Sequence, residues 1–333
     1  MSTSISSTSA LQPAPGLQGR DLLSLADLTS EELGTIIDAA SRLKRAHDDE
    51  VPHALLPRQT LGMLFEKASL RTRTTFAVGM AHLGGQAVDL MSEHTQLGVR
   101  ESVPDIAHNL ERWVDVIMAR VYEHGVLDEL AEHARVPVIN GLSDRFHPCQ
   151  ALADLLTLRE RFGTLEKLTL AYVGDGFNVC HSLLIAGALS GMNVRVGSPH
   201  IYPPDPKIVE HAQRLASATG AGIEMMFSAE AAVEGADAVY TDSWVSMGLE
   251  SERPQRVAAF SAFQVNASLM ARAHPRAVFM HCLPAHRGEE VTDEVMDGPQ
   301  SIVFDQAENR LHAQKALLVL LVRGEAAIGA LPK

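Results

Sequence analysis

Cysteine is rare in this sequence of 333 residues, and long apolar runs are absent from it. The three cysteines, Cys149, Cys180 and Cys282, are an odd number without a C-x-x-C pair. We therefore expect no disulfide framework and a reducing, cytoplasmic environment. No stretch reaches the roughly 18 consecutive apolar residues of a membrane-spanning helix, so we expect no membrane partner.

Basic residues are also in the minority, with 28 Lys and Arg against 41 Asp and Glu and a formal net charge of −13. Nucleic-acid binding draws most of its affinity from contacts between cations and phosphates, so this balance argues against a nucleic-acid partner. Hydrophobic residues make up 46% of the chain and charged residues 21%, which predicts a substantial packed core.

Residues 1–19 contain neither the continuous apolar segment of a secretory signal nor the repeated arginines of a transit peptide. Serine and threonine are frequent in this segment instead, a composition that cannot bury a core. We therefore expect a disordered N-terminal arm.

Short apolar runs alternate with helix-length periodic segments from residue 60 onward, the pattern of parallel sheets covered on both faces by helices. The predicted strands are residues 60–65, 87–91, 114–119, 136–140, 168–175, 193–198, 223–227, 236–242, 277–282 and 301–305. Helices are predicted over residues 69–84 and 103–113, among others. Because the strands fall into one group before residue 148 and another after it, we expect an α/β fold with two doubly wound parallel-sheet domains.

Two amphipathic helices are expected to join these domains. Residues 148–163 begin with Pro148 and end with Gly163, as helix-capping preferences predict, and residues 307–323 form a helix that returns across the junction. The first domain then comprises residues 20–147 with the C-terminal segment 324–333, and the second comprises residues 164–306. Ligands are expected at the carboxyl ends of the strands.

The segment after the first predicted strand has the composition of a phosphate site. Ser69 can cap a helix whose first turn contains Leu70, Arg71, Thr72 and Arg73, which would gather N–H groups, hydroxyl groups and two guanidiniums at one point. Arginine at a helix N-terminus opposes the helix dipole, so its presence there indicates a need for positive charge. The alternative is an ordinary capped helix with solvated arginines.

Polar side chains follow other predicted strands. Arg120 ends the third strand, and His147 precedes a helix, where we expect a neutral imidazole that is either a substrate ligand or a structural residue. Gly174 and Gly176 resemble the start of a dinucleotide fingerprint, but the third glycine and the later acidic residue are missing. We therefore expect this turn to bring Asn178 to the strand end instead of binding NAD.

Two later segments also carry reactive side chains. Asp242 follows a strand and precedes a polar stretch with Gly248, which suits either a mobile lid or an ordinary surface connection. Residues 280–290, MHCLPAHRGEE, have the composition of a zinc site. The spacing of His281 and His286 fits a pair of zinc ligands, but Pro284 would interrupt a helix that presented them, so we expect no metal here.

Seven segments, in this order, resemble the aspartate and ornithine carbamoyltransferase family and, within it, the enzymes that use ornithine: FEKASLRTRTTF, MARVYEHG, FHPCQALADLLTL, YVGDGFN, TDSWVSMG, HCLPAHRGEEVTDEV and VFDQAENRLHAQKALL. They cover nearly the whole chain from about residue 20. The resemblance implies a carbamoyl-phosphate domain and an amino-acid domain joined by two helices. It also implies assembly as a homotrimer, or a multiple of trimers, with shared active sites.

The activity implied by the resemblance is transfer of the carbamoyl group of carbamoyl phosphate to the δ-amine of L-ornithine, without a metal or other cofactor. The residues implied to bind carbamoyl phosphate are Ser69, Leu70, Arg71, Thr72, Gln96, Arg120, His147, Gln150, Cys282, Leu283 and Arg310. Gln96 matches a residue that reaches into the neighbouring subunit's site. Leu70 departs from the family motif S-T-R-T-R, which has Thr as its second residue, and so lacks one hydroxyl contact.

The residues implied to bind ornithine are Asn178, Asp242, Ser246 and Met247, and Phe177 stands where many relatives have Asn. The residues implied to act in catalysis are Arg120, His147, Asp242 and Cys282. The first two would polarise the carbonyl group, and the last two would orient and deprotonate the amine, with the thiol as ligand or proton acceptor. The alternatives are a sister enzyme for N-acetylornithine or putrescine, an NAD-dependent oxidoreductase and a catalytically silent homologue.

Overall fold

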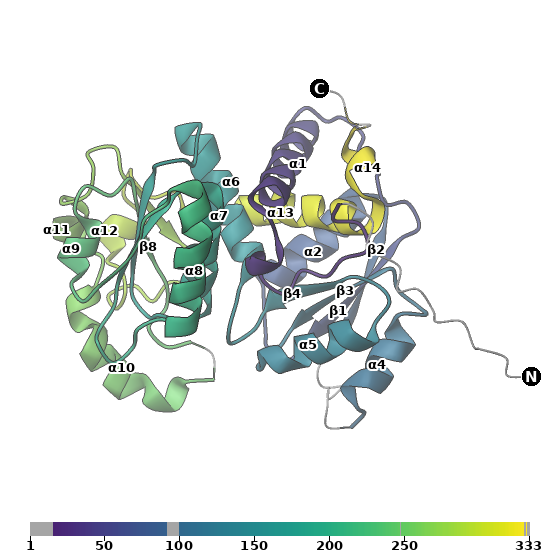
Figure 1. Ribbon diagram of the computed structural model, residues 1–333, viewed down its shortest axis with the longest axis horizontal. Helices are drawn as coiled ribbons and strands as arrows, with labels where there is room; N and C mark the ends of the chain where they lie inside the picture. Colours follow the sequence, from purple (N-terminus) through teal and green to yellow (C-terminus); the bar gives the residue numbers. More distant parts are fainter. Residues whose placement is uncertain (1–15, 92–99, 247, 330, 332–333) are drawn as a thin grey trace, which may run out of the picture.

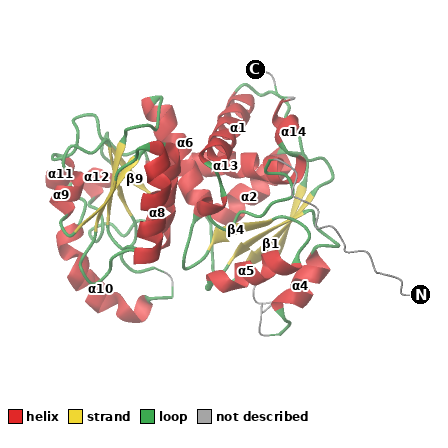
Figure 2. Cartoon of the chain, viewed as in Figure 1, coloured by secondary structure: helices red, strands yellow, loops and turns green. Residues whose placement is uncertain are grey.

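The computed structural model describes residues 16–91, 100–246, 248–329 and 331. Two α/β lobes lie side by side, and the C-terminal helices, yellow in Figure 1, return to the lobe that contains the start of the chain. Each lobe is built on one parallel sheet with helices on both of its faces (Figure 2). The fold class expected from the sequence is confirmed.

The first domain contains a four-stranded sheet with the order β2-β1-β3-β4. Its strands are β1 (Thr60–Phe65), β2 (Gln86–Met91), β3 (Val116–Arg120) and β4 (Val138–Leu142). Its helices are α1 (Ser30–Asp48), α2 (Arg71–His82), α4 (Val103–Leu110) and α5 (His124–His133), with a short 3-10 helix η1 (Leu25–Asp27) before them. All three strand pairs are parallel.

Alternation along β3 explains why both faces of this sheet are covered. Val116 and Met118 pack into the same core as α1 and α2, whereas Ile117 and Ala119 pack into a separate core with α4 and α5. Successive side chains of a strand point to opposite faces, so an uninterrupted apolar strand requires helices on each side.

The second domain contains a five-stranded parallel sheet with the order β7-β6-β5-β8-β9. Its strands are β5 (Thr169–Val173), β6 (Asn193–Gly197), β7 (Ile223–Met226), β8 (Ala238–Thr241) and β9 (Val278–His281). Its helices are α7 (Asn178–Ser190), α8 (Pro206–Thr219), α9 (Ala229–Val233), α10 (Arg253–Phe260), α11 (Ala267–Met270) and α12 (Asp293–Met296), with 3-10 helices η2 (Glu250–Glu252) and η3 (Ser261–Phe263). Leu170 and Tyr172 of β5 face the core that contains α7 and α8, and Ala171 and Val173 face the core that contains α9.

Two long helices join the domains. Helix α6 (Pro148–Phe162) ends at Gly163, whose φ of 80° is the left-handed value that favours glycine after a helix. Helix α13 (Val303–Arg323) packs against α1, α2 and α6, and α14 (Glu325–Gly329) follows it in the first lobe (Figure 1). Both long helices contribute buried residues to one hydrophobic core that extends through the two domains.

The strand predicted over residues 301–305 is wrong. Ser301 forms only an isolated bridge with Phe279, and α13 already begins at Val303, before the predicted start of the returning helix. A short apolar run is compatible with either a strand or the first turn of a buried helix, and its periodicity alone does not distinguish them. Here the amphipathic helix downstream extends back through the run.

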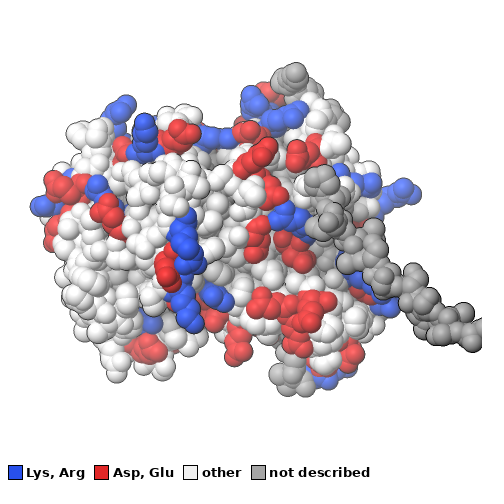
Figure 3. Space-filling view, in the orientation of Figure 1, with Lys and Arg blue, Asp and Glu red and all other residues white. Residues whose placement is uncertain are grey.

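The face of the molecule in Figure 3 carries Lys and Arg in small groups interspersed with Asp and Glu. Among the described residues, no helix is both long enough and apolar enough to cross a membrane.

Candidate active site

A pocket of about 530 Å³ lies where the carboxyl ends of strands from both domains meet. Its lining includes these residues singled out from the sequence: Ser69, Leu70, Arg71, Thr72, Arg120, His147, Asn178, Asp242, Ser246, Cys282, Leu283 and Arg310. Gln150 lies behind the lining. Gln96 and Met247 lie outside the described residues. Residues spread over about 240 positions of sequence thus converge on one cavity, as the strand-end rule predicts.

The N-terminal end of α2 forms one wall of the pocket. Helix α2 begins at Arg71 with Leu70 as its N-cap, one residue later than the sequence suggested, and Leu70 makes no side-chain capping bond. Ser69 Oγ, one residue earlier, still accepts a hydrogen bond from the backbone N–H of Thr72 at 3.3 Å. Leu70 is 76% exposed, so its apolar side chain lies outside the packed interior, whereas its backbone lies at the N-terminal end of α2. This wall offers N–H groups and a positive dipole end to an anion.

Arg73 does not join Arg71 in the pocket, contrary to the expectation that both guanidiniums converge. Arg73 forms an ion pair with Asp89 of β2, and its guanidinium lies 4.4 Å from the centroid of the Phe65 ring. Residues two apart on a helix are about 200° apart around its axis, so only one of the two can face the cavity. The positive charge of the motif at the pocket is therefore that of Arg71 alone.

Three guanidiniums nevertheless gather at the pocket, because Arg120 ends β3 and Arg310 lies on α13. Burial, followed by the charges of the neighbouring Arg310 and Arg71, lowers the pKa of Arg120 to about 10. Burial also lowers the pKa of Arg71 and of Arg310. Like charges gathered in a buried place repel one another, so this cluster is suited to an anion with more than one charge.

Neutral partners hold Arg310 in place. Its Nη1 donates to Gln150 Oε1 at 2.6 Å, and its Nη2 donates to Thr72 Oγ1 at 3.0 Å. Gln150 Nε2 in turn donates to the buried Asp154 at 2.8 Å, and Gln306 Nε2 donates to the same Asp154 oxygen at 2.7 Å. Gln150 therefore acts on the pocket through Arg310, and this network links α2, α6 and α13.

His147 is the residue before α6 and is 4% exposed. Burial lowers the pKa of its imidazole well below the usual range, and Arg310, Arg120 and Arg71 lower it further. Its Nδ1 has no hydrogen-bond partner among the described residues. The geometry thus agrees with the neutral imidazole expected from the sequence.

The second domain contributes a carboxylate and a thiol on the opposite side of the pocket. Cys282 Sγ donates to Asp242 Oδ1 at 2.9 Å, and the backbone N–H of Ser243 donates to the same oxygen at 2.7 Å. Burial raises the pKa of the Cys282 thiol well above its usual range, and the Asp242 carboxylate raises it further. Cys282 is therefore a protonated hydrogen-bond donor, which argues against the proton-acceptor role left open by the sequence.

Asn178 is the first residue of α7, and its Nδ2 donates to the backbone carbonyl of Ser143 in the first domain at 2.6 Å. The turn before it contains Gly176, where a Cβ atom would lie 2.1 Å from Pro204 N and 2.4 Å from Pro203 C. The glycine is thus required by the close approach of residues 203–204. Because packing accounts for it, this turn gives no support to the dinucleotide alternative.

Gly176→Ala is expected to destabilise the fold by about 3 kcal/mol, because backbone atoms that cannot move aside occupy the space of the new methyl group. Urea unfolding would measure the loss. Gly34→Ala is the matched control, since Gly34 lies in α1 with no atom within 4 Å of an added Cβ, and should gain about 0.5–1 kcal/mol. Equal stability of the two variants would contradict the steric argument.

The segment MHCLPAHRGEE is held together by its own side chains. His281 Nδ1 accepts from the backbone N–H of Leu283 at 2.8 Å, and His281 Nε2 contacts Glu290 Oε1 at 3.2 Å. Leu283 has a φ of 59°, a left-handed value that is uncommon outside glycine. His281 and Glu290 are fully buried, so they fix the backbone beside Cys282 and do not line the cavity.

Sequence reasoning missed several residues of the lining, namely Lys67, Ser243, Glu250, Arg253 and His286. Lys67 follows the end of β1, so its position after a strand was a usable signal. Its Nζ lies 4.5 Å from the centroid of the Tyr122 ring, and burial, followed by the charge of Arg120, lowers its pKa. Lys67 and Arg253 thus add two further cations to the lining beside Arg71, Arg120 and Arg310.

A buried ion pair outside the lining was also missed. Arg256 Nη1 lies 2.6 Å from Asp175 Oδ2 and donates to the carbonyl of Trp244 at 3.2 Å. Because Trp244 lies between Asp242 and Ser246, this pair anchors the loop that carries both pocket residues. Arg256 and Asp175 are about 80 positions apart in the sequence, so no local sequence pattern predicts their ion pair.

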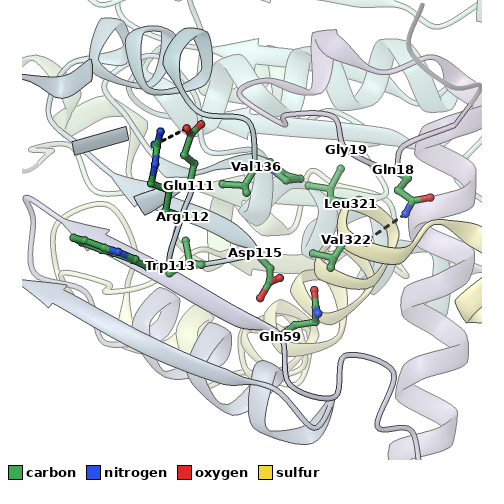
Figure 4. Close-up of a pocket in the computed structure, with 12 residues that line it drawn as sticks. Gln18, Gly19, Gln59, Glu111, Arg112, Trp113, Asp115, Val136, Leu321 and Val322 are labelled. Atoms are coloured by element: carbon green, nitrogen blue, oxygen red, sulfur yellow. Dashed lines mark hydrogen bonds and ion pairs between the residues drawn. The ribbon is translucent and has the colours of Figure 1, made fainter. Parts of the chain in front are cut away.

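Figure 4 shows another hollow, of about 440 Å³, which borders the amino ends of strands in the first sheet. Gln59, Asp115 and Val136, which line it, precede β1, β3 and β4. Asp115 Oδ2 accepts from the backbone N–H of Thr60 at 2.7 Å, and Arg112 pairs with Glu111 at 2.8 Å (Figure 4). The charged groups of this hollow pair with each other or with the backbone and so stabilise the fold. The pocket between the domains is therefore the candidate active site.

Comparison with known proteins gives the same assignment for both domains. Residues 20–160 match the model of the carbamoyl-P binding domain of aspartate/ornithine carbamoyltransferase, and residues 166–321 match that of the Asp/Orn binding domain. The ornithine carbamoyltransferase of Pyrococcus abyssi is 52% identical over 308 residues, which are 92% of this chain and 97% of that protein. The anabolic ornithine carbamoyltransferase of Pyrococcus furiosus is 52% identical over 308 residues, with 92% of this chain and 98% of that protein covered.

A solved structure, the ornithine carbamoyltransferase from Pyrococcus furiosus, aligns with a TM-score of 0.91 and 51% sequence identity. The alignment covers 93% of this chain and 99% of the solved one. Family models that span both domains and a fold match of this quality lead to one conclusion. The chain belongs to the aspartate/ornithine carbamoyltransferase family.

Proposed function

We propose that this protein transfers the carbamoyl group of carbamoyl phosphate to the δ-amine of L-ornithine, giving L-citrulline and phosphate. One observation carries the proposal: a cluster of three guanidiniums faces an Asp242–Cys282 pair across a single cavity between the two domains. An anionic phosphate fits the first group, and a cationic amino acid fits the second. Relatives about half identical to this chain are named ornithine carbamoyltransferase.

The phosphate end of the donor would bind at the start of α2. Arg71, Arg120 and Arg310 would neutralise its charge, and their stabilising effect would grow as the bond from carbon to the bridging oxygen breaks. The N–H groups near Ser69 and Thr72 would bind phosphate oxygens. His147 would donate from a neutral nitrogen to the carbonyl oxygen, together with Arg120, and so polarise the carbon for attack.

The amino-acid acceptor would bind on the second-domain side. Asp242 would bind an ammonium group of ornithine, with Asn178 and Ser246 at the α-amino-acid end. The resemblance adds Met247, which lies outside the described residues, to this set. Cys282, as a thiol, would orient the Asp242 carboxylate, and the backbone carbonyl groups of Cys282 and Leu283 would hold the carbamoyl NH₂. Attack by the neutral δ-amine forms the N–C bond of a tetrahedral intermediate. Its C–O bond to phosphate then breaks, and the departing phosphate takes up the proton that the attacking nitrogen loses.

Most of the rate acceleration would come from bringing the two substrates together in one orientation. Holding two reactants in an attack geometry replaces a bimolecular encounter by an intramolecular step, an effect of about 7–11 kcal/mol at its largest. Because each substrate is held chiefly by a different domain, the α6 and α13 junction and the network around Asp154 would set their relative position.

A substitution at Cys282 tests this division of roles. Cys282→Ser is expected to lower kcat/KM for ornithine about tenfold, since a hydroxyl keeps one hydrogen bond to Asp242 with altered length. Affinity for carbamoyl phosphate should not change. Steady-state kinetics with each substrate varied would measure both. Cys180→Ala, at a buried thiol of α7 outside the pocket, is the control, and unchanged kinetics in both variants would remove Cys282 from the mechanism.

The proposed function itself is tested by citrulline formation from carbamoyl phosphate and an amine panel of ornithine, N-acetylornithine, putrescine and aspartate, with phosphate release measured in parallel. We expect turnover with ornithine far above the other amines. Preference for N-acetylornithine or putrescine would assign a sister activity, and no turnover with any amine would indicate a silent homologue.

Assembly and cellular context remain part of the same proposal. A homotrimer with shared sites is proposed from the family resemblance, with Gln96 reaching a neighbouring subunit. A reducing, cytoplasmic location is consistent with the free state of Cys149, Cys180 and Cys282. A role in arginine biosynthesis is favoured by the relative named anabolic.

A further inference from the structure

A cluster of histidines lies in the first domain, away from the residues that line the pocket between the domains. His47 is in the last turn of α1, His53 follows in the next loop, and His82 ends α2. One ring nitrogen from each of the three lies within 4.8 Å of the others. His47 and His82 stack with ring centroids 4.9 Å apart, and a surface hollow of about 400 Å³ is lined by all three.

A fourth imidazole and a lysine, both from α13, lie directly beside this cluster. The centroid of the His312 ring is 5.6 Å from that of His47. His312 is buried, and its Nδ1 has no hydrogen-bond partner among the described residues, whereas its Nε2 lies 3.7 Å from Glu308 Oε1. His82 Nδ1 is likewise buried without a partner. Buried polar atoms are nearly always bonded, so unpartnered imidazole nitrogens at one place indicate a ligand.

The surroundings reduce the basicity of two imidazoles of this cluster, His53 and His82. Burial lowers the pKa of His53 and of His82, and the charge of Lys315 lowers both further. Burial lowers the pKa of His312 to about 3. A zinc-type ion binds the unprotonated form of an imidazole, so lowered pKa values are compatible with ligation at these positions.

We propose that His47, His53 and His82 form a binding site for a divalent transition-metal ion of the zinc type, separate from the active site. Three imidazoles that converge at the surface suit Zn²⁺, Ni²⁺ or Cu²⁺ and not the oxygen-preferring Mg²⁺ or Ca²⁺. Zn–N bonds of about 2.0–2.1 Å bring tetrahedral ligand atoms to about 3.4 Å from one another, so modest side-chain rotation closes the site.

His53 already has the outer contacts of a metal ligand. Its Nδ1 lies 2.7 Å from the backbone carbonyl of Val51, an arrangement that orients the ring and leaves Nε2 with a lone pair. Lys315 Nζ lies 2.7 Å from that Nε2. Burial lowers the pKa of Lys315 to about 8. Lys315 therefore occupies the lone pair of His53 Nε2 that a metal ion would take.

The test uses the untagged full-length chain with Cys282→Ser as the common background, which removes the thiol of the active site as a metal ligand. Zn²⁺ binding is measured by titration calorimetry, and Co²⁺ binding by its visible absorption. His47→Ala and His82→Ala, alone and together, are the test variants. His211→Ala, on α8 of the other domain, is the matched control.

We expect the background chain and His211→Ala to bind one Zn²⁺ at this site, and each cluster variant to bind at least about 100-fold more weakly. Lys315→Met should bind about tenfold more tightly, because a positive charge and a competing donor are lost. Unfolding curves measured without metal identify any variant that is destabilised. If His82→Ala does not fold, His47→Ala, at an exposed position, provides the test on its own.

Equal Zn²⁺ stoichiometry and an unchanged Co²⁺ spectrum in the double variant would overturn the site. So would the absence of Zn²⁺ binding in the background chain. Neither result bears on carbamoyl transfer, because in the natural chain with Cys282 intact His47→Ala and His82→Ala should form citrulline at the unaltered rate.

Discussion

Arg71→Ala is expected to lower kcat/KM for carbamoyl phosphate about 10³-fold, the largest effect among the single substitutions considered. Arg71 is the only arginine of the first turn of α2 that lines the pocket, since Arg73 pairs with Asp89. Its loss removes a partly buried cation from the place where, under the proposed function, charge would develop on the departing phosphate. Initial rates of citrulline formation with each substrate varied would measure the change.

Arg73→Ala supplies the control from the same helical turn. It removes an equal charge two residues away but leaves the pocket lining intact, so we expect activity within about twofold of the unaltered protein. We expect a small loss of folding stability, because the contacts of Arg73 with Asp89 and Phe65 disappear. If the two variants lost activity equally, the assignment of one arginine to the pocket and the other to the sheet would be wrong.

Asp242→Asn is expected to have the second-largest effect, lowering kcat/KM for ornithine about 100-fold. The amide keeps the size of the side chain but loses the negative charge that would bind an ammonium group. Carbamoyl phosphate should bind as before, because Arg71, Arg120 and Arg310 are untouched. Kinetics with ornithine varied, and calorimetric titration with carbamoyl phosphate, would separate the two effects.

Asp237→Asn is the matched control at the other end of the same strand. Asp237 precedes β8 and accepts a hydrogen bond from the backbone N–H of Thr169 at 2.9 Å, whereas Asp242 follows β8 at the pocket. We expect Asp237→Asn to retain normal kinetics with ornithine. An Asp242→Asn enzyme that used ornithine normally would require another residue to bind the ammonium group.

The strands were predictable because their signal is local. β1 was predicted over its full range, and most other strands within one or two residues at each end, since parallel strands buried on both faces are short apolar runs. The exception was the run at residues 301–305, whose helical state depends on the residues that follow it. Its composition alone carries no information on which element it extends.

The sequence predicted those pocket residues that directly follow a strand. Arg120 and Asp242 each follow a parallel strand, and such strands present their carboxyl ends at one edge of a sheet. Arg310 is different, because it lies within a helix, and the strand-end rule gives no reason to select it. Only the resemblance to the family pointed to Arg310, and packing of α13 against α2 and α6 explains its position.

The sequence by itself determined the α/β class, the succession of two domains and the residues near the strand ends, because periodicity and turn chemistry act over a few residues. Tertiary structure alone decided that Arg73 pairs with Asp89 instead of joining Arg71 at the pocket, that the Cys282 thiol donates to Asp242, and that His47, His53 and His82 meet. Each of these depends on charges, burial and partners brought together from distant segments. Such partners are fixed by the packing of whole elements, which no local pattern encodes.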